Sequence, residues 1–388
     1  MMGQTCTTEK MVPDVLSFAY GLFSLLATNA PEPNVLVSPF SVASALGLVL
    51  AGATIDSKGE AELSDVLNVN SHLDLPLLSS AVLESASSES SVTLTSANGI
   101  WSRNLKSSYI STVKKKHLAE ASDLPNTYKP INEYITDKTN GLISNMLEGE
   151  IDPLVVAVLV NAVHFKGQWA EKFDSSHTTK GKFTTESGEM RDAMFMFAER
   201  KIPVALEVEE LQGANMLRLD YGEKNEYAAY FILPDENTNE SMSGVIQGLV
   251  ELSKKGSEAL GDVFGQMSSH MKVAVTLPRF QVEYGVRSIK DELQSLGINE
   301  VFGGREGFME MSDDPDVHLD DVLHKAAMEV TEEGTEAAAA TAGVMMTRSL
   351  PRPPIPVVFD RPFVMIIMHE PTKTPLFLAR IDDPVFSF

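Results

Sequence analysis

The sequence predicts a mixed α+β fold that is built around large sheets. Apolar residues at helical spacing dominate the first half of the 388 residues, whereas short β-type segments dominate the second half. Strands and helices seldom alternate regularly, which argues against a doubly wound parallel sheet. Residues 154–165 form a continuous apolar, β-branched run, which predicts a strand buried on both faces at the centre of a sheet. No linker-like segment interrupts residues 1–388, so a single domain is expected.

Composition and charge limit the classes of function. Hydrophobic residues make up 43% of the chain, which is enough to build a large core. The chain has 54 acidic and 31 basic residues and a net charge of −23, so it lacks the basic footprint that nucleic-acid binding requires. Cys6 is the only cysteine, which excludes an internal disulfide, and no apolar run reaches transmembrane length. The usual motifs for metal ions and cofactors do not occur, so neither is expected.

The N-terminal residues bear on where the protein works. Residues 1–8 have no apolar core, so no cleavable signal peptide is predicted, which indicates the cytoplasm or non-classical export. If translation starts at Met2, Gly3 fits a myristoylation pattern and Cys6 is placed for a second acyl chain. A disordered polar terminus is the favoured alternative. Asn239 begins a glycosylation sequon that matters only if the chain is secreted.

Helical spacing predicts most elements of the first half. The predicted helices cover residues 12–27, 41–50, 57–67, 107–118 and 130–147. The helix over 41–50 is apolar almost all round and follows a short buried strand, so it is expected inside the protein. The serine-rich residues 79–91 are expected to form the end of a helix and a loop, with Glu84 and Glu89 in solvent. Alternation over residues 92–101 predicts a strand.

The second half is read mainly as strands. Several short strands are expected within residues 182–233, and further strands over 273–282, 364–368 and 375–381. A weak helix reaches about residue 260, and a second helix over 288–296 ends at Gly297. Residues 319–331 form a further extended segment.

A basic run, Lys114-Lys115-Lys116-His117, lies near the end of the predicted helix over 107–118. Such a run could bind a heparin-like polyanion. A solvated helix end is favoured, because cations suit the negative end of the helix dipole and the whole chain is strongly acidic.

Residues 332–356 are the most unusual segment. They begin Glu332-Glu333-Gly334-Thr335-Glu336, continue with Ala337, Ala338, Ala339 and Ala340, and become rich in proline after Arg348. Read as a strand, every second residue from Thr335 to Gly343 is small and uncharged, whereas Glu336 lies on the other face. This face could enter a slot in a sheet at little steric or desolvation cost. From these residues alone, an alanine-rich helix or a loop remains an alternative.

The segment Glu-Glu-Gly-Thr-Glu-Ala-Ala-Ala-Ala-Thr, residues 332–341, resembles the hinge of the reactive loop of inhibitory serpins, which are serine protease inhibitors. The resemblance covers nearly the whole chain. It includes Ser38-Pro39-Phe40-Ser41 before the buried helix and the central strand that continues into Trp169. It implies three sheets, about nine helices, an exposed reactive-centre loop within residues 332–356 and a monomer.

The resemblance also implies a target and a mechanism. Counting along the family's loop from Glu332 places the reactive bond between Arg348 and Ser349, so the implied partner is a trypsin-like serine protease. Arg352 is the rival, but Pro353 follows it and fits a serine protease poorly. The protease would form a covalent acyl-enzyme, and the loop would then insert into the main sheet.

Two further groups of residues match the family. One is the central hydrogen-bond cluster where strands part, called the shutter, and it would comprise Ser38, Ser41, Asn161 and His324. The other is the opening at the top of the sheet, called the breach, and it would comprise Trp169, Arg279 and Glu332, with an ion pair between the last two. Simple core packing is the alternative for each residue.

Catalysis by the chain itself is not predicted. The sequence has no Gly-x-Ser-x-Gly elbow or phosphate-binding loop, and His164 and His324 lie on predicted buried strands as core histidines do. The alternatives to an inhibitor are a non-inhibitory serpin that acts as a carrier, chaperone or storage protein, and a hydrolase that uses one of these histidines.

Overall fold

Three β-sheets organise the computed structural model, which describes residues 14–29, 32–235, 241–268, 271–303, 307–334 and 353–384. Over these ranges nine α-helices accompany the sheets, which confirms the predicted α+β class and architecture. The helices are α1 (Leu16–Asn29), α2 (Pro39–Gly52), α3 (Lys58–Leu67), α4 (Asp74–Ser88), α5 (Ser107–Thr112), α6 (Lys129–Lys138), α7 (Ser241–Lys254), α8 (Ser257–Gly265) and α9 (Lys290–Ser295). A π-helical turn, Val113–His117, extends α5.

The strands divide among sheets of six, four and five strands. The six-stranded sheet has the order β1 (Val35–Val37), β15 (Thr374–Ile381), β14 (Phe363–His369), β9 (Tyr227–Leu233), β8 (Ala214–Tyr221) and β7 (Val204–Val208). The four-stranded sheet has the order β13 (Ile355–Val358), β10 (Lys272–Pro278), β6 (Met190–Lys201) and β5 (Thr179–Thr184). The five-stranded sheet has the order β11 (Phe280–Ser288), β12 (Asp321–Val330), β4 (Ala157–Gly167), β2 (Val92–Ser102) and β3 (Glu120–Asp123).

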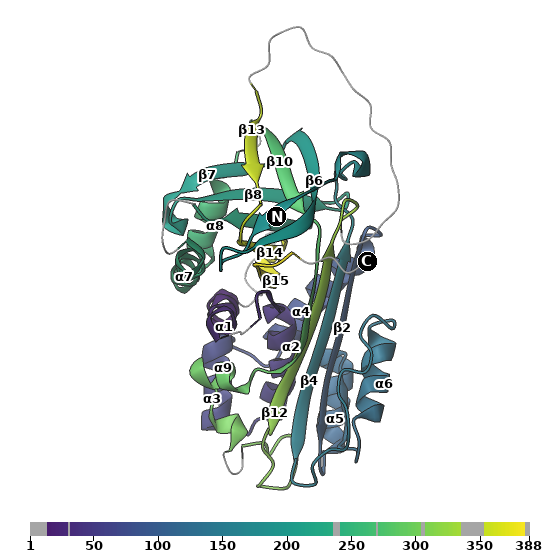
Figure 1. The fold of residues 1–388 in the computed structure, drawn as a ribbon. Helices are drawn as coiled ribbons and strands as arrows, with labels where there is room; N and C mark the ends of the chain where they lie inside the picture. The colour runs from purple at the N-terminus through teal and green to yellow at the C-terminus, as the bar shows by residue number, and fades with distance from the viewer. Residues whose placement is uncertain are drawn as a thin grey trace, which may run out of the picture.

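The five-stranded sheet has two parallel strands at its centre. In Figure 1, β12, β4 and β2 run side by side along the length of the molecule. β12 pairs with β4 in parallel from Asp321 opposite Val158 to Ala327 opposite His164, and we call this pairing the central seam. The neighbours outside the seam are antiparallel, because β11 pairs antiparallel with β12 and β2 pairs antiparallel with β4.

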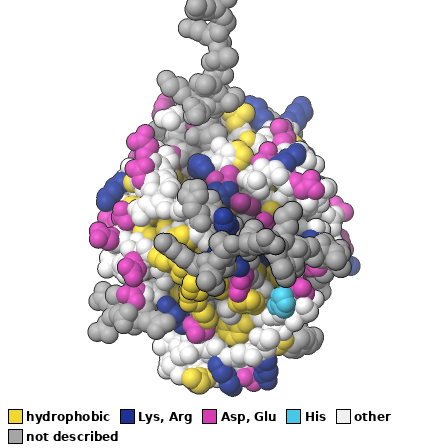
Figure 2. Space-filling model, turned by 90° about the horizontal axis from the view of Figure 1, so that it is seen from above, with side chains coloured by type: hydrophobic (Ala, Val, Ile, Leu, Met, Phe, Trp, Pro, Cys, Tyr) yellow, Lys and Arg dark blue, Asp and Glu magenta, His cyan; other side chains and the backbone are white. Residues whose placement is uncertain are grey.

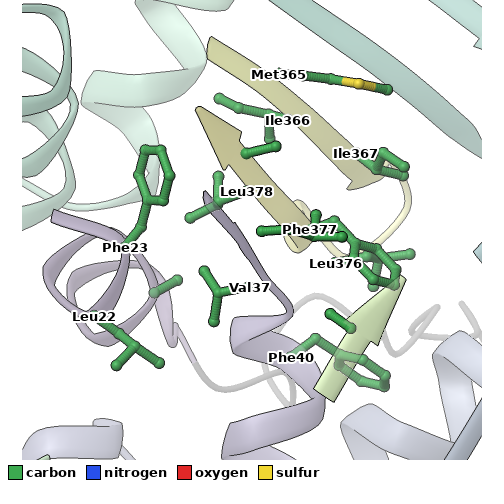
Figure 3. Packing of buried hydrophobic residues seen from close by; sticks show 14 of the residues in the cluster. Leu22, Phe23, Val37, Phe40, Met365, Ile366, Ile367, Leu376, Phe377 and Leu378 are labelled. Carbon is green, nitrogen blue, oxygen red and sulfur yellow. The ribbon is translucent and has the colours of Figure 1, made fainter. Parts of the chain in front are cut away.

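Apolar side chains fill the space between the sheets and helices. Figure 3 shows Leu22 and Phe23 of α1, Val37 of β1 and Phe40 of α2 in one apolar cluster with Phe377 and Leu378 of β15. α2 is buried on nearly every side, as its apolar sequence predicts. A second core cluster lies between α6 and the five-stranded sheet.

The central strand is correctly predicted in place and burial, but it begins later than the apolar run. Leu154 is 84% exposed, and β4 begins at Ala157. The carboxylate of Asp320 accepts hydrogen bonds from the backbone N–H groups of Val156 (2.6 Å) and Ala157 (3.0 Å), which fixes this start beside β12.

The predicted helix over residues 130–147 is wrong beyond Lys138. Asn140 and Gly141 adopt left-handed backbone conformations, with φ of 53° and 79°. The Gly141 N–H donates to the Thr136 carbonyl at 2.8 Å, which closes the helix end. The periodic apolar residues after this point still face the sheet, but from an irregular segment.

The expectation for Glu89 is also wrong. α4 remains helical to Ser88, and Glu89 follows it with only 6% of its surface exposed, whereas Glu84 is exposed as expected. The Glu89 carboxylate accepts backbone hydrogen bonds from Ser91 (3.3 Å) and Lys224 (3.2 Å). These hydrogen bonds stabilise the buried Glu89 carboxylate, which the serine-rich sequence around it had suggested would lie in solvent.

The predicted strand over residues 273–282 is in fact two strands in two different sheets. β10 ends at Pro278 and β11 begins at Phe280, so Arg279 lies at the junction of the four-stranded and five-stranded sheets. Its backbone N–H donates to the Met194 carbonyl at 2.7 Å. This junction places the Arg279 side chain beside the end of β12.

Candidate functional site

A buried hydrogen-bond cluster spans the middle of the central seam. His324 of β12 lies opposite Asn161 of β4, and His324 Nδ1 is 2.5 Å from Asn161 Oδ1. The Asn161 side-chain amide donates to the hydroxyl of Ser41 and also to its carbonyl, the latter at 3.2 Å. His324 Nε2 lies 3.3 Å from the backbone nitrogen of Ser38. The four residues predicted for the shutter are therefore in contact, and each is at most 1% exposed.

These contacts define the protonation state of His324. The Asn161 Oδ1 and the Ser38 N–H require a donor at Nδ1 and an acceptor at Nε2, which is one tautomer of the neutral ring. Burial lowers the pKa of His324 from 6.5 to about 3, because the charged ring would lose its hydration. A protonated ring would also point an N–H at the Ser38 N–H. The cluster is therefore built around a neutral histidine.

Sequence reasoning missed two residues of β2 that contact this cluster. Asn98 of β2 lies opposite Asn161, and its side-chain oxygen accepts from the Asn161 amide. Ser96 of the same strand lies 3.2 Å from the Ser41 hydroxyl. The cluster thus joins β12, β4, β2 and the start of α2. Asn98 precedes Gly99 inside a predicted strand, and this unusual pair could have identified it from the sequence.

β12 ends in a tight turn that is held against the segment following β4. We call residues 331–334 the hinge turn. The Trp169 indole N–H donates to the Thr331 carbonyl at 2.9 Å, and the Trp169 backbone N–H donates to the Glu333 carbonyl at 2.9 Å. Phe173 donates its backbone N–H to the Glu332 carbonyl at 2.8 Å. Three successive carbonyls of the hinge turn are thus held from the β4 side of the seam.

Two ion pairs fix the acidic side chains of the hinge turn. Glu332 Oε2 lies 3.5 Å from Arg279 Nε, so the ion pair expected from the sequence is present. The other Glu332 carboxylate oxygen accepts from the Thr178 hydroxyl at 2.7 Å. Glu333 Oε2 lies 2.6 Å from Lys172 Nζ, a contact that the sequence did not suggest. All four charged side chains of these pairs are at least three-quarters buried.

Gly334 closes the hinge turn at a position where no side chain fits. Its φ is 118°, and a Cβ atom there would stand 2.2 Å from the Gly167 carbonyl oxygen and 2.6 Å from the Trp169 backbone nitrogen. Gly334 also forms an isolated bridge with Gln168. Glycine is needed here both for the backbone conformation and for the close approach to β4.

Several predicted residues lie outside the described part of the chain. They are the remaining hinge residues Thr335, Ala337, Ala338, Ala339 and Ala340, the reactive-bond residues Arg348 and Ser349, the N-terminal Gly3 and Cys6, and the sequon residue Asn239. Figure 2 shows the molecule from above, where acidic and basic side chains are interspersed beside an apolar region.

The enzyme alternative finds little support at the predicted histidines. His324 is 1% exposed and both of its ring nitrogens are engaged, and His164 is half-buried on β4. Within the described ranges, no group of three or more His, Cys, Asp or Glu side chains is placed to hold a metal ion. Within the same ranges, no helix is long and apolar enough to cross a membrane.

Comparison with known families agrees with this geometry. The sequence model of the family described as Serpin (serine protease inhibitor) matches residues 14–384. The chain belongs to the serpin family. A leukocyte elastase inhibitor from Sus scrofa is 31% identical over 380 residues, covering 95% of this chain and 97% of that protein. A serine protease inhibitor from Cyanea capillata is 32% identical over 386 residues, covering 94% and 96%.

Solved serpin structures have the same fold. An Arabidopsis serpin in its native stressed conformation aligns with a TM-score of 0.83 and 27% identity, over 97% of this chain and 99% of that one. Human thyroxine-binding globulin in complex with thyroxine aligns with a TM-score of 0.84 over 97% and 99%, but its identity of 22% supports the fold alone. The family's name and both curated relatives point to protease inhibition rather than hydrolysis.

Proposed function

We propose that this serpin inhibits trypsin-like serine proteases as a suicide substrate, with Arg348–Ser349 as the reactive bond. The observation that supports this proposal most strongly is the parallel central seam with the hinge turn at its upper end. A chain that reverses at the hinge turn and enters the seam would run antiparallel to β12. Because β4 is parallel to β12, the same chain would run antiparallel to β4 as well. The closed seam is therefore a site where one added strand gains two antiparallel partners.

The chemical step would belong to the protease. Its serine hydroxyl attacks the Arg348 carbonyl carbon, an ester forms, and the bond to Ser349 breaks as the new amine takes a proton. Arg348 supplies specificity, since its guanidinium matches the carboxylate of a trypsin-type pocket in bidentate geometry. The names of the curated relatives support inhibition of serine proteases in general, and Arg348 directs the proposal to the trypsin type.

Insertion of the cleaved loop would trap the acyl-enzyme. The stretch 333–347 has fifteen residues, and at ~3.3 Å per residue it would carry the bound protease roughly 50 Å. Every second residue from Thr335 is small and uncharged, so the inward face of the new strand costs little to bury. Fast insertion matters because hydrolysis of the ester would release an active protease.

The two clusters have proposed roles in this movement. Ser38, Ser41, Asn161 and His324 would form the shutter, which joins the strands that must part halfway along the seam. Trp169, Arg279 and Glu332 would form the breach, where the first loop residues enter. The hinge, from Gly334 through Thr335 to Ala340, would be the first part to insert. We expect residues 1–388 to act as one unit and as a monomer.

Incubation with trypsin tests the proposal. We expect an SDS-stable complex of serpin and protease, and mapping of the released peptide should give a new N-terminus at Ser349. Cleavage without a complex would favour the second candidate, a non-inhibitory carrier like the thyroxine-binding relative in fold. Turnover of the substrate by the chain itself would favour a hydrolase.

A polyanion cofactor and lipid anchoring are not part of the proposed mechanism. A fold neighbour, protease nexin-1, was solved with heparin, but its 24% identity supports the fold alone. In the basic run, Lys114 already pairs with Glu120 at 3.2 Å, and His117 is half-buried. The lipidation of Gly3 and Cys6 stays a sequence-based prediction.

A further inference from the structure

We propose that Lys172 and Glu333 form a charged latch that helps to keep the upper end of the central seam closed in the uncleaved protein. Both are positioning residues, and the inference deepens the proposed function because it concerns the opening that loop insertion needs.

The Arg279–Glu332 pair does not span the seam. Arg279 directly precedes β11, and Glu332 follows β12, so each side chain is attached to one of two adjacent, antiparallel strands. β11 and β12 are paired from Phe280 opposite Val330 to Ser288 opposite Leu323. When β12 separates from β4, both members of this pair can move with the same half of the sheet.

The Lys172–Glu333 pair does span the seam. Lys172 follows β4, and Glu333 follows β12, and their charged atoms are 2.6 Å apart. The strands to which they are attached are the two that must part for a loop strand to enter. Opening at this point therefore separates the two charges, whereas it can leave Arg279 beside Glu332.

The surroundings of the pair make it more than an exposed surface contact. Lys172 and Glu333 are 23% and 19% exposed, so water screens them only partly. Backbone bonds from Trp169 and Phe173 hold the carbonyls of Glu333 and Glu332 on either side of the ion pair. Lys172 thus lies within a short segment that holds the hinge turn through Trp169 and Phe173 on either side of it.

This assignment predicts which substitutions loosen the seam. Lys172→Gln and Glu333→Gln should each expose the hinge turn to transient opening about fivefold more often, as expected for loss of a part-buried ion pair. The double variant should open no more than either single variant, since each single variant already removes the ion pair between the two residues. Reversal of the charges, Lys172→Glu with Glu333→Lys, should restore most of the lost protection.

Hydrogen–deuterium exchange of the uncleaved protein tests the latch without a protease. The probe peptides should cover residues 168–173 and 328–334, and the matched control is Lys180→Gln. Lys180 pairs with Asp192 at 2.9 Å between β5 and β6, which are neighbours in one sheet. This ion pair is far more exposed than the pair of Lys172 and Glu333. We expect faster exchange in Lys172→Gln and in 0.5 M salt, and no change in Lys180→Gln. Equal exchange in Lys172→Gln and the unmodified protein, with both correctly folded, would overturn the proposal.

The result remains distinct from the test of protease inhibition. Faster exchange in a protein that forms no complex with trypsin would support the latch and reject the proposed function. If Lys172→Gln traps trypsin normally and its hydrogen exchange is unchanged, the proposed function is supported and the latch is rejected. Charge reversal that fails to restore protection would show that Lys172 acts through its bulk alone and would also overturn the latch.

Discussion

His324 Nδ1 lies 2.5 Å from Asn161 Oδ1, at a position where the two parallel central strands pair residue for residue. The contact belongs to a buried cluster that also holds Ser38 and Ser41 at the start of α2. Opening the seam at this level would break it and leave Asn161 and His324 with unpaired polar atoms. The closed sheet is therefore held at mid-height by the hydrogen bonds of a neutral histidine.

Acidification should destabilise the uncleaved protein through His324. Its pKa is about 3 when folded and about 6.5 when unfolded, so between these values the unfolded chain binds the extra proton. The contribution of His324 to the free energy of unfolding is fully present above about pH 6.5 and is lost as the pH falls from 6.5 towards 3. The urea midpoint should fall over this range, and it should fall less steeply in His324→Gln.

Two other histidines also contribute to the pH dependence of stability. Burial also lowers the pKa of His117 and of His369 to about 4, so some pH dependence should survive in His324→Gln. The same slope in the variant and the unmodified protein would contradict the assignment of a neutral His324.

Gly334→Ala should destabilise the uncleaved form by about 1–3 kcal/mol, since the new Cβ meets the Gly167 carbonyl and the backbone has a positive φ. Gly188→Ala is the matched control, because Gly188 also has a positive φ but nothing lies within 4 Å of its Cβ position. Thermal unfolding should show the larger loss for Gly334→Ala. Equal losses would mean that contact with β4 is unimportant.

Thr335→Arg should convert the inhibitor into a substrate, because a charge would have to enter the sheet with the inserting strand. The measurement is the number of serpin molecules consumed per trypsin inhibited, which should rise severalfold. Glu336→Arg places the same side chain on the opposite face of the strand and should have a much smaller effect. An unchanged ratio in Thr335→Arg would rule out burial of that face.

Arg348→Ala should abolish inhibition of trypsin, since the specificity pocket would lose its charged partner. Arg352→Ala is the control and should inhibit normally, because Pro353 disfavours cleavage at that position. Inhibition assays against trypsin distinguish the two. Loss of inhibition in Arg352→Ala with activity retained in Arg348→Ala would move the reactive bond.

The sequence predicted the central strand from a local signal, whereas the shutter contacts were predicted from the resemblance to serpins. A continuous β-branched run marks β4, and the polar residues Asn161 and His324 are conspicuous within buried strands. The resemblance to serpins then connected residues that are far apart in the chain. The clustering of Ser38 with His324 could not be read from composition or spacing.

The failures share a different cause. The pattern of residues 273–282 suits one long strand, and only tertiary contacts show that Arg279 moves the chain into another sheet. Glu89 is buried because Ser91 and the distant Lys224 supply its donors. Lys172 meets Glu333 only because β4 and β12 are neighbours. Each depends on a partner that no local pattern identifies.

We propose that the main sheet of the uncleaved chain lacks one strand, which the chain's own loop can provide. The most direct test compares the melting temperature of the intact protein with that of protein cleaved between Arg348 and Ser349. We expect a large rise after cleavage, because the inserted strand would pair with β4 and β12. Identical melting temperatures before and after cleavage would contradict it.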